Sequence, residues 1–200
     1  SAKSINENLT AVHTFSANES ITWSLNGGSD AGKFNINSSS GALSFANAPD
    51  YENPTDSGSN NSYVVGVRAT DSSGNTSDQT VTISINDLDE VAPTITGPSG
   101  SAGASNSANT IYEHSTAVHT FSANESVTWS LNGGADAGKF NINSSSGALS
   151  FANAPDYENP TDSDSNNSYV VGVRATDGSG NTSDQTVTVS INDLDDTPPS

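Results

Sequence analysis

Residues 85–93 read Ile-Asn-Asp-Leu-Asp-Glu-Val-Ala-Pro, an apolar alternation that ends in clustered carboxylates and a proline. Nearly the same residues return at 191–199, which read Ile-Asn-Asp-Leu-Asp-Asp-Thr-Pro-Pro. Carboxylates this close repel one another unless a cation lies among them. The chain has 23 acidic and only 5 basic side chains, so it cannot supply enough counter-charge itself. A divalent cation with oxygen ligands can, and calcium is the usual one.

The bulk composition excludes several classes of partner. A formal net charge of −18 at pH 7 disfavours nucleic acid and anionic membrane surfaces, which both need cationic patches. The sequence contains no apolar run long enough to span a membrane, so we expect no membrane insertion. It has no cysteine, which fits either a cytosolic protein or a secreted bacterial one stabilised by metal rather than by disulfides. The N-terminus is no signal peptide, and the chain is expected to be a piece of a longer protein.

The chain is a tandem repeat. Shifted by 106 residues, positions 11–90 match positions 117–196 at all but six places. The largest of the six differences replaces Gly58 by Asp164. A repeat near 100 residues is too long for a solenoid unit and fits an independent β-sandwich domain. We therefore predict one domain at residues 1–92, which lacks the opening segment of its twin, and a second domain at residues 93–200.

Each repeat is predicted to be all-β, with about seven strands and no helix. Residues 21–25 alternate apolar and polar side chains, as a half-buried strand does. Residues 34–36 and 43–45 flank a loop that contains glycine, which is typical of a hairpin. Residues 63–69 and 81–85 each place apolar side chains on one face.

The segment between the repeats has a mixed character. Residues 94–96 read Thr-Ile-Thr and are a candidate first strand of the second repeat. Residues 97–105 consist of glycine, proline, serine and alanine, a composition typical of a flexible linker.

Further acids recur at the ends of the predicted strands. Glu7 precedes the first long strand, and residues 50–52 read Asp-Tyr-Glu after the hairpin. In an extended strand, alternate side chains share a face, so the Asp and Glu of this tripeptide would point the same way. Residues 69–71 read Ala-Thr-Asp. All three pieces have twins in the second repeat.

Taken together, these motifs resemble the cadherin repeat: Glu7-Asn8, Asp50-Tyr51-Glu52, Ala69-Thr70-Asp71, and Asp87-Leu88-Asp89-Glu90 ahead of Pro93. Their order and spacing match across the whole repeat, in both copies. The resemblance implies tandem Greek-key β-sandwich domains, of the cadherin or immunoglobulin-like kind, with calcium ions held at the junction between repeats.

Carried over residue by residue, the resemblance also implies a ligand set. Seven carboxylates would meet at the junction and would be neutralised by about two or three divalent ions, with Asp89 reaching across to Asp177. The implied calcium ligands at the junction are carboxylates or backbone carbonyls of Glu7, Asp50, Glu52, Asp87, Leu88, Asp89, Glu90, Val91 and Asp177. The corresponding acids of the second repeat would form weaker half-sites: Glu113, Asp156, Glu158, Asp193, Asp195 and Asp196.

The chain departs from the family in places. The family usually has an Asp-x-Asp pair before the tryptophan strand, where residues 122–125 here read Ser-Ala-Asn-Glu. Trp23 and Trp129 lie mid-strand and are expected in the core. The near-identical repeats, the lack of cysteine and the Asn/Ser/Thr/Gly-rich surface look like the cadherin-like arrays of large bacterial surface adhesins.

Other interpretations remain beside this one. Residues 162–166 imitate the start of an EF-hand loop, but the later glycine and glutamate are missing. The acids are expected at the ends of sandwiches rather than in a cleft, so we predict no enzyme. The main hypothesis is a calcium-binding extender of a secreted or cell-surface adhesin, whose partners are the neighbouring repeats. The alternative is an adhesive module that binds a glycan, a cell-surface protein or itself, for which Tyr51, Tyr112 and Tyr157 are the candidate contact residues.

Overall fold

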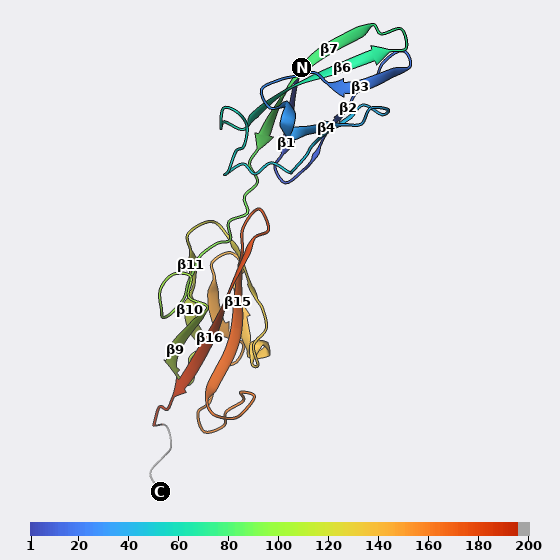
Figure 1. The fold of residues 1–200 in the computed structure, drawn as a ribbon. Coiled ribbons are helices and arrows are strands. Elements are labelled where there is room, and N and C mark those ends of the chain that lie inside the picture. Colours follow the sequence, from blue (N-terminus) through green and yellow to red (C-terminus); the bar gives the residue numbers. More distant parts are fainter. Residues whose placement is uncertain (196–200) are drawn as a thin grey trace. The chain divides into compact units, whose positions relative to one another are not determined.

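The computed structural model describes residues 1–195, and these form an all-β protein. The chain divides into two compact units, the first spanning Ser1–Asp89 and the second beginning at Glu90 (Figure 1). The helical segments among the described residues are two single turns, η1 (Ala31–Lys33) and η2 (Ala137–Lys139).

The first unit is a sandwich of two sheets. The larger sheet has the order β1-β7-β6-β3 and the smaller has the order β2-β5-β4. The chain passes between the sheets after β1, β2, β3 and β5, which is a Greek-key arrangement. In this unit β1 and β7 run parallel, and the other pairs are antiparallel. The strands are β1 (Ala2–Asn6), β2 (Ala11–Thr14), β3 (Ile21–Leu25), β4 (Phe34–Ile36), β5 (Ala42–Phe45), β6 (Ser62–Asp71) and β7 (Thr76–Asn86).

The core of this unit follows from the period-two pattern of its longest strands. On β7, Val81, Ile83 and Ile85 are buried, whereas the intervening side chains are exposed or half-buried. Tyr63 on β6 lies opposite Ile83 in the antiparallel register. Phe34 and Phe45 from the other sheet close the core, with ring centroids 4.3 Å apart. Each sheet thus supplies one apolar face, and the two faces meet.

The second unit repeats this sandwich and adds two short strands. Its larger sheet has the order β12-β15-β16-β9, and its smaller sheet has the order β10-β14-β13. A separate two-stranded pair joins β11 to β8. The strands are β8 (Ile95–Thr96), β9 (Asn106–Tyr112), β10 (Ala117–Thr120), β11 (Ser122–Ala123), β12 (Thr128–Leu131), β13 (Phe140–Ile142), β14 (Ala148–Phe151), β15 (Ser168–Thr176) and β16 (Thr182–Asn192).

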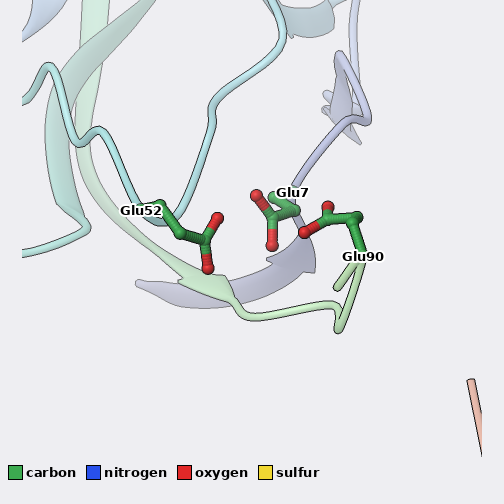
Figure 2. Close-up of side chains that lie close together, drawn as sticks. All are labelled: Glu7, Glu52 and Glu90. Carbon is green, nitrogen blue, oxygen red and sulfur yellow. The ribbon is translucent and has the colours of Figure 1, made fainter. Parts of the chain in front are cut away.

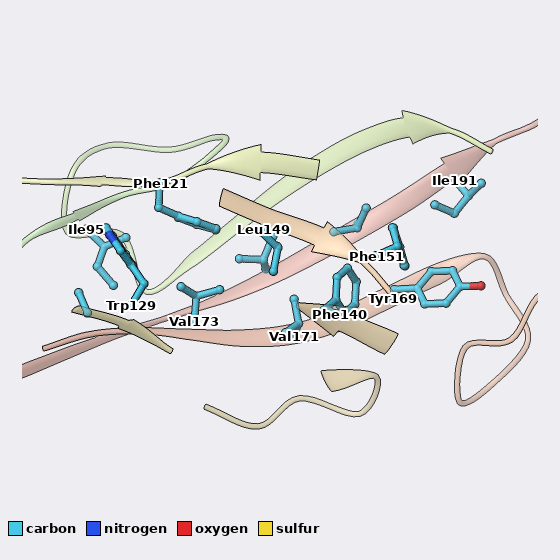
Figure 3. Packing of buried hydrophobic residues seen from close by; sticks show 13 residues of the cluster. Ile95, Phe121, Trp129, Phe140, Leu149, Phe151, Tyr169, Val171, Val173 and Ile191 are labelled. Atoms are coloured by element: carbon cyan, nitrogen blue, oxygen red, sulfur yellow. The ribbon is translucent and has the colours of Figure 1, made fainter. Parts of the chain in front are cut away.

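The core of the second unit contains the same residue types at matching positions (Figure 3). Phe140, Phe151 and Tyr169 pack together, with the Phe151 and Tyr169 ring centroids 5.0 Å apart. Trp129 is buried, as its place in mid-strand predicts, whereas its twin Trp23 is only partly buried and packs against the core of the first unit. Ile95 from β8 joins this core and is only 2% exposed.

The segment that precedes β9 is more ordered than its glycine-rich composition predicts. The buried side chain of Gln185 donates a hydrogen bond to the carbonyl of Ala104 at 2.8 Å. The backbone N–H of Thr186 donates to the carbonyl of Ser105 at 2.9 Å. These contacts fasten the segment to β16, so it is part of the second sandwich rather than a free linker.

Candidate metal centre

Glu7 is a buried carboxylate that joins three segments of the first unit. It follows β1 and is 1% exposed. Its Oε2 accepts the backbone N–H of Tyr51 at 2.7 Å, and its Oε1 accepts that of Leu88 at 2.8 Å. Its own N–H donates to the carbonyl of Asn86 at 3.1 Å. One side chain therefore ties the end of β1 to the loop after the hairpin and to the chain that leaves β7.

Glu113 repeats this arrangement in the second unit. It is also 1% exposed and accepts the N–H groups of Tyr157 and Leu194 at 2.7 and 2.8 Å. Hydrogen bonds from Leu194 and then Tyr157 hold the pKa of Glu113 below its usual value, although burial opposes this. Glu113 is therefore ionised at neutral pH despite its burial.

Other carboxylates converge on these two buried glutamates. In the second unit, Glu113, Asp156 and Glu158 each offer an oxygen within 4.8 Å of the others. Around Glu7 the group is completed by Glu52 and by Glu90, the residue that follows the first unit (Figure 2). Figure 2 shows the carboxylates of Glu7 and Glu90 close together, with Glu52 across from them.

The spacing and chemistry of these groups fit a calcium ion. Calcium binds oxygen ligands at about 2.3–2.6 Å, so ligands on opposite sides of one ion lie up to about 5 Å apart. The carboxylate oxygens of each group lie within 4.8 Å of one another, so one ion could reach all three. The donors are all carboxylate oxygens, which suit a hard cation better than a transition metal.

The Asp-Tyr-Glu tripeptide is not strand-like, and this prediction was wrong. Residues 51–53 form a bend directly after Asp50, whose Oδ1 accepts the N–H of Asn53 at 3.0 Å. Asp156 and Asn159 form the same bond, also at 3.0 Å. A short carboxylate side chain that bonds to a nearby N–H favours a turn over a strand. The bend turns the N–H of the middle tyrosine to the buried glutamate.

Asp177 has a different environment, at the turn after β15. Its Oδ1 accepts the N–H groups of Ser179 and Asn181, both at 2.8 Å, and its Oδ2 accepts the Asn181 side chain at 2.9 Å. Burial acts against ionisation, yet these hydrogen bonds lower the pKa of Asp177 below its usual value. Glu125 places a carboxylate oxygen within 4.8 Å of Asp177. The sequence interpretation did not include Glu125, although it lies where the family has acids.

The remaining predicted ligands follow the last strand of each unit. Asp87 and Asp89 are exposed after β7, and Leu88 and Val91 are 40% and 70% exposed. Asp193 and Asp195 are exposed after β16, whereas Asp196 lies outside the described residues. Within residues 1–195, the carboxylate groups include none of Asp50, Asp87, Asp193 and Asp195. Their roles as ligands stay predictions.

Two further pairs of buried acids have structural roles that the sequence did not reveal. In the first unit, Asp30 accepts the N–H groups of Ser57 and Val64 at 2.7 and 2.8 Å. Asp56 accepts those of Asn60 and Asn61 within its own loop. Asp136 and Asp162 make the corresponding bonds in the second unit. These carboxylates accept backbone N–H groups and, unlike Glu7 and Glu113, none of them belongs to a group of three or more acids within residues 1–195, so we assign them to loop anchoring.

Sequence comparison relates the chain to a known protein but to no family model. No protein-family model matches the chain. Protocadherin Fat 2 of the rat (Rattus norvegicus) is 29% identical over 197 residues, which cover 94% of this chain and 4% of that protein. This match agrees with the predicted resemblance to cadherin repeats, and the chain spans a small fraction of the relative's length.

Two solved structures align with 98% of the chain. The EC3-6 cis-dimer of protocadherin gammaB7 has a TM-score of 0.48 at 23% identity, and 46% of that chain is covered. Mouse cadherin-23 EC22-24 has a TM-score of 0.47 at 20% identity, with 64% of that chain covered.

No helix within residues 1–195 is long and apolar enough to cross a membrane.

Proposed function

We propose that this chain is a calcium-binding extender, a tandem segment of a secreted or cell-surface adhesin that calcium stiffens. One recurring observation supports it most. In each repeat a buried glutamate accepts two backbone N–H groups, and further carboxylates lie within 4.8 Å of it. The same costly arrangement occurs twice, at equivalent positions, in a chain whose net charge is −18.

A bound cation would offset the repulsion between the neighbouring carboxylates. Two like charges about 4 Å apart repel by about 1 kcal/mol in water, and by about 4 kcal/mol at an effective dielectric constant near 20. A divalent cation converts this repulsion into attraction. Glu7 with Glu52 and Glu90, and Glu113 with Asp156 and Glu158, would be carboxylate ligands of calcium. The backbone bonds to Glu7 and Glu113 hold those two carboxylates in place before an ion arrives.

The mechanical part of the proposal concerns the junction between repeats. Following the cadherin resemblance, Asp89 is the acid that reaches from the first repeat toward Asp177 of the second, and the carbonyls of Leu88 and Val91 complete the ligand shells. When acids of both repeats share ions, bending would break coordination bonds. Calcium would therefore stiffen the junction, and its removal would leave a repelling, flexible hinge.

The place of action follows from the same resemblance. The rat relative is named a protocadherin, and we extend an extracellular role in adhesion from it to this chain. The absence of cysteine and the near-identical repeats support a bacterial adhesin. Neighbouring repeats are then the partners, and no catalytic activity is proposed.

Small-angle scattering of the 200-residue chain tests the proposal. The parent should become more elongated and less flexible when calcium is added. Asp89→Ala should still bind calcium through Glu7 and Glu52 but should fail to elongate. Asp195→Ala, the matched substitution in the second repeat, should elongate as the parent does. If the parent shows no calcium-dependent elongation, the extender role is wrong; if Asp89→Ala elongates normally, Asp89 is not the bridge.

The alternative adhesive function receives less support. Tyr51, Tyr112 and Tyr157 are 36%, 56% and 38% exposed. Single exposed aromatic side chains are common on soluble proteins, and recognition of a partner usually involves a contiguous patch. The recurring carboxylate groups therefore favour the extender.

A further inference from the structure

Each repeat has a pocket between its single helical turn and the loop that follows its hairpin. The pocket has a volume of about 380 Å³ in the first unit and about 370 Å³ in the second, at the lower end of the range for ligand pockets. Its lining residues lie within 32–63 in the first unit and within 138–169 in the second, and the two sets match position for position. The pocket is therefore a property of the repeat itself, since both copies of the sequence form it.

The base of the pocket carries a buried hydroxyl group. Tyr63 is 1% exposed, and its hydroxyl accepts the backbone N–H of Thr55 at 3.2 Å. Its other hydrogen-bond contact, Thr55 Oγ1, lies 3.4 Å away, whereas two hydroxyl groups in a good hydrogen bond are about 2.7–2.8 Å apart. Tyr169 and Thr161 repeat both contacts at 3.1 and 3.4 Å, and Figure 3 shows the Tyr169 hydroxyl directed away from the neighbouring phenylalanine rings. The long contact leaves a hydroxyl group that can turn to a ligand.

Polar side chains without partners surround this base. Lys33, Asn47 and Asn53 line the pocket and are exposed, and within residues 1–195 their side chains make no hydrogen bond or ion pair. Asp50 accepts the N–H of Asn53 with Oδ1, which leaves Oδ2 available. Their counterparts in the second pocket are Lys139, Asn153, Asn159 and Asp156.

The lysine of each pocket lacks an acidic partner. The sequence has only 5 basic side chains beside 23 acidic ones, and Arg68 and Arg174 each pair with an aspartate on the neighbouring strand. Lys33 and Lys139 make no such pair among the described residues, and each of them lines a pocket. Each pocket thus offers one cationic donor and one anionic acceptor, so the charges of its lining balance.

These groups favour an uncharged, polar ligand. An anion would be repelled by a chain of net charge −18, and a cation would be attracted more strongly by the carboxylates around Glu7 and Glu113. Hydroxyl groups both donate and accept hydrogen bonds, and so do the amide groups of asparagine. A zwitterion would use the lysine and the aspartate but would leave the amides and the phenol hydroxyl with fewer partners. A compact molecule with several hydroxyl groups therefore matches the pocket best.

We propose that this pocket binds an uncharged monosaccharide unit, either a free sugar or the last sugar of a glycan. Lys33 and Asn47 would donate to its hydroxyl oxygens, and Asp50 Oδ2 would accept from one of its hydroxyl groups. The Tyr63 hydroxyl would reach the sugar from the base of the pocket, and Ala48 would contact its C–H groups. This binding goes beyond the extender function and does not involve the exposed tyrosines.

Amide NMR spectra of the 200-residue chain, recorded in EDTA, test this proposal. The probes are glucose, galactose and mannose, each as the free sugar and as its methyl glycoside. At least one sugar should give saturable shifts with a dissociation constant near the millimolar range, confined to amides around residues 46–55 and 152–161. Equal binding of the methyl glycoside would assign the pocket to the end of a glycan, because its anomeric oxygen is substituted, and binding of the free form only would assign it to a free sugar. The zwitterion alanine should give no saturable shift.

Variants of the chain give the matched controls. The double substitution Lys33→Ala and Lys139→Ala should weaken sugar binding about tenfold or more, because hydrogen bonds from charged donors are the stronger ones. Lys3→Ala removes an exposed cation outside the pocket and should bind sugar as the parent does. The double variant should still elongate with calcium, because neither lysine is a candidate calcium ligand, so failure of this proposal and failure of the extender function are distinguishable.

Two results would overturn the proposal. The first is the absence of saturable shifts with every sugar at high millimolar concentration, and the second is equal binding by the parent and the double lysine variant. Saturable shifts of the same amides with alanine, but not with sugars, would assign the pocket to a zwitterion and overturn our choice of ligand.

Discussion

Replacement of Glu7 by alanine should destabilise the first repeat even without calcium. The carboxylate accepts the N–H groups of Tyr51 and Leu88, and bonds to charged groups contribute about 1.5–3 kcal/mol each. Tyr51 and Leu88 are partly exposed, so water can reach their N–H groups once the carboxylate is removed. We therefore take the low end of this range for each of the two bonds, which gives a total loss of about 3 kcal/mol. Removal of one negative charge beside Glu52 and Glu90 relieves repulsion and offsets about 1 kcal/mol of this loss. The hydrogen bonds dominate, and the net loss is about 2 kcal/mol.

This loss is large for a unit of this size. A change of 1 kcal/mol shifts the melting temperature of a 60–100-residue domain by about 4–8 °C, so Glu7→Ala should lower it by about 8–16 °C. Glu7→Gln keeps one acceptor oxygen and should lose about half as much. Circular dichroism melting in EDTA, with hydrogen exchange to locate the change in the first repeat, is the assay. Glu19→Ala removes an exposed charge from the same repeat and serves as control. Equal melting of Glu7→Ala and Glu19→Ala would refute the structural role of Glu7.

Three further results are expected in calcium-free buffer. The folded state lowers the pKa of Glu113 and Asp177, so the stability that these two carboxylates contribute is present above their usual pKa values and is lost as pH falls through the lowered ones. A melting temperature of the second repeat that stays constant from pH 6 to pH 3 would contradict this. Gln185→Ala should destabilise the second repeat by about 2 kcal/mol, whereas Gln79→Ala should change stability by less than about 0.5 kcal/mol, and similar effects would contradict the burial difference. The first repeat, with Trp23 only half-buried, should exchange its amide hydrogens before the second, and the reverse order would show that β8 adds no stability.

Much of the fold could be predicted because the strands are patterned locally. The alternation of Val81, Ile83 and Ile85 placed them on one buried face, as the structure has them. The strand at β1 was missed, since residues 2–6 contain one buried apolar side chain, Ile5, and pair in parallel with β7 from the far end of the repeat. Such a long-range pairing leaves no local pattern in a single sequence.

The candidate site was harder to predict for the same reason. The resemblance to cadherin repeats implied that Glu7 and Glu52 belong together, but the sequence did not indicate that Glu7 would be buried and bonded to two backbone N–H groups. The alternation of side chains in a strand also predicted that Asp50 and Glu52 share one face. Hydrogen bonding within the tripeptide's own turn instead produces a bend. Glu125 becomes a neighbour of Asp177 only through the fold, because more than 50 residues separate them in the sequence.

Calorimetric titration of calcium into the EDTA-stripped 200-residue chain tests the central claim most directly. We expect saturable binding at millimolar calcium or below, with tighter sites at the junction acids and weaker ones around Glu113, Asp156 and Glu158. A ligand at about 100 times its dissociation constant adds about 2.7 kcal/mol of stability per site, so the melting temperature of the titrated sample should rise as well. Absence of both binding heat and thermal stabilisation at millimolar calcium would contradict the account.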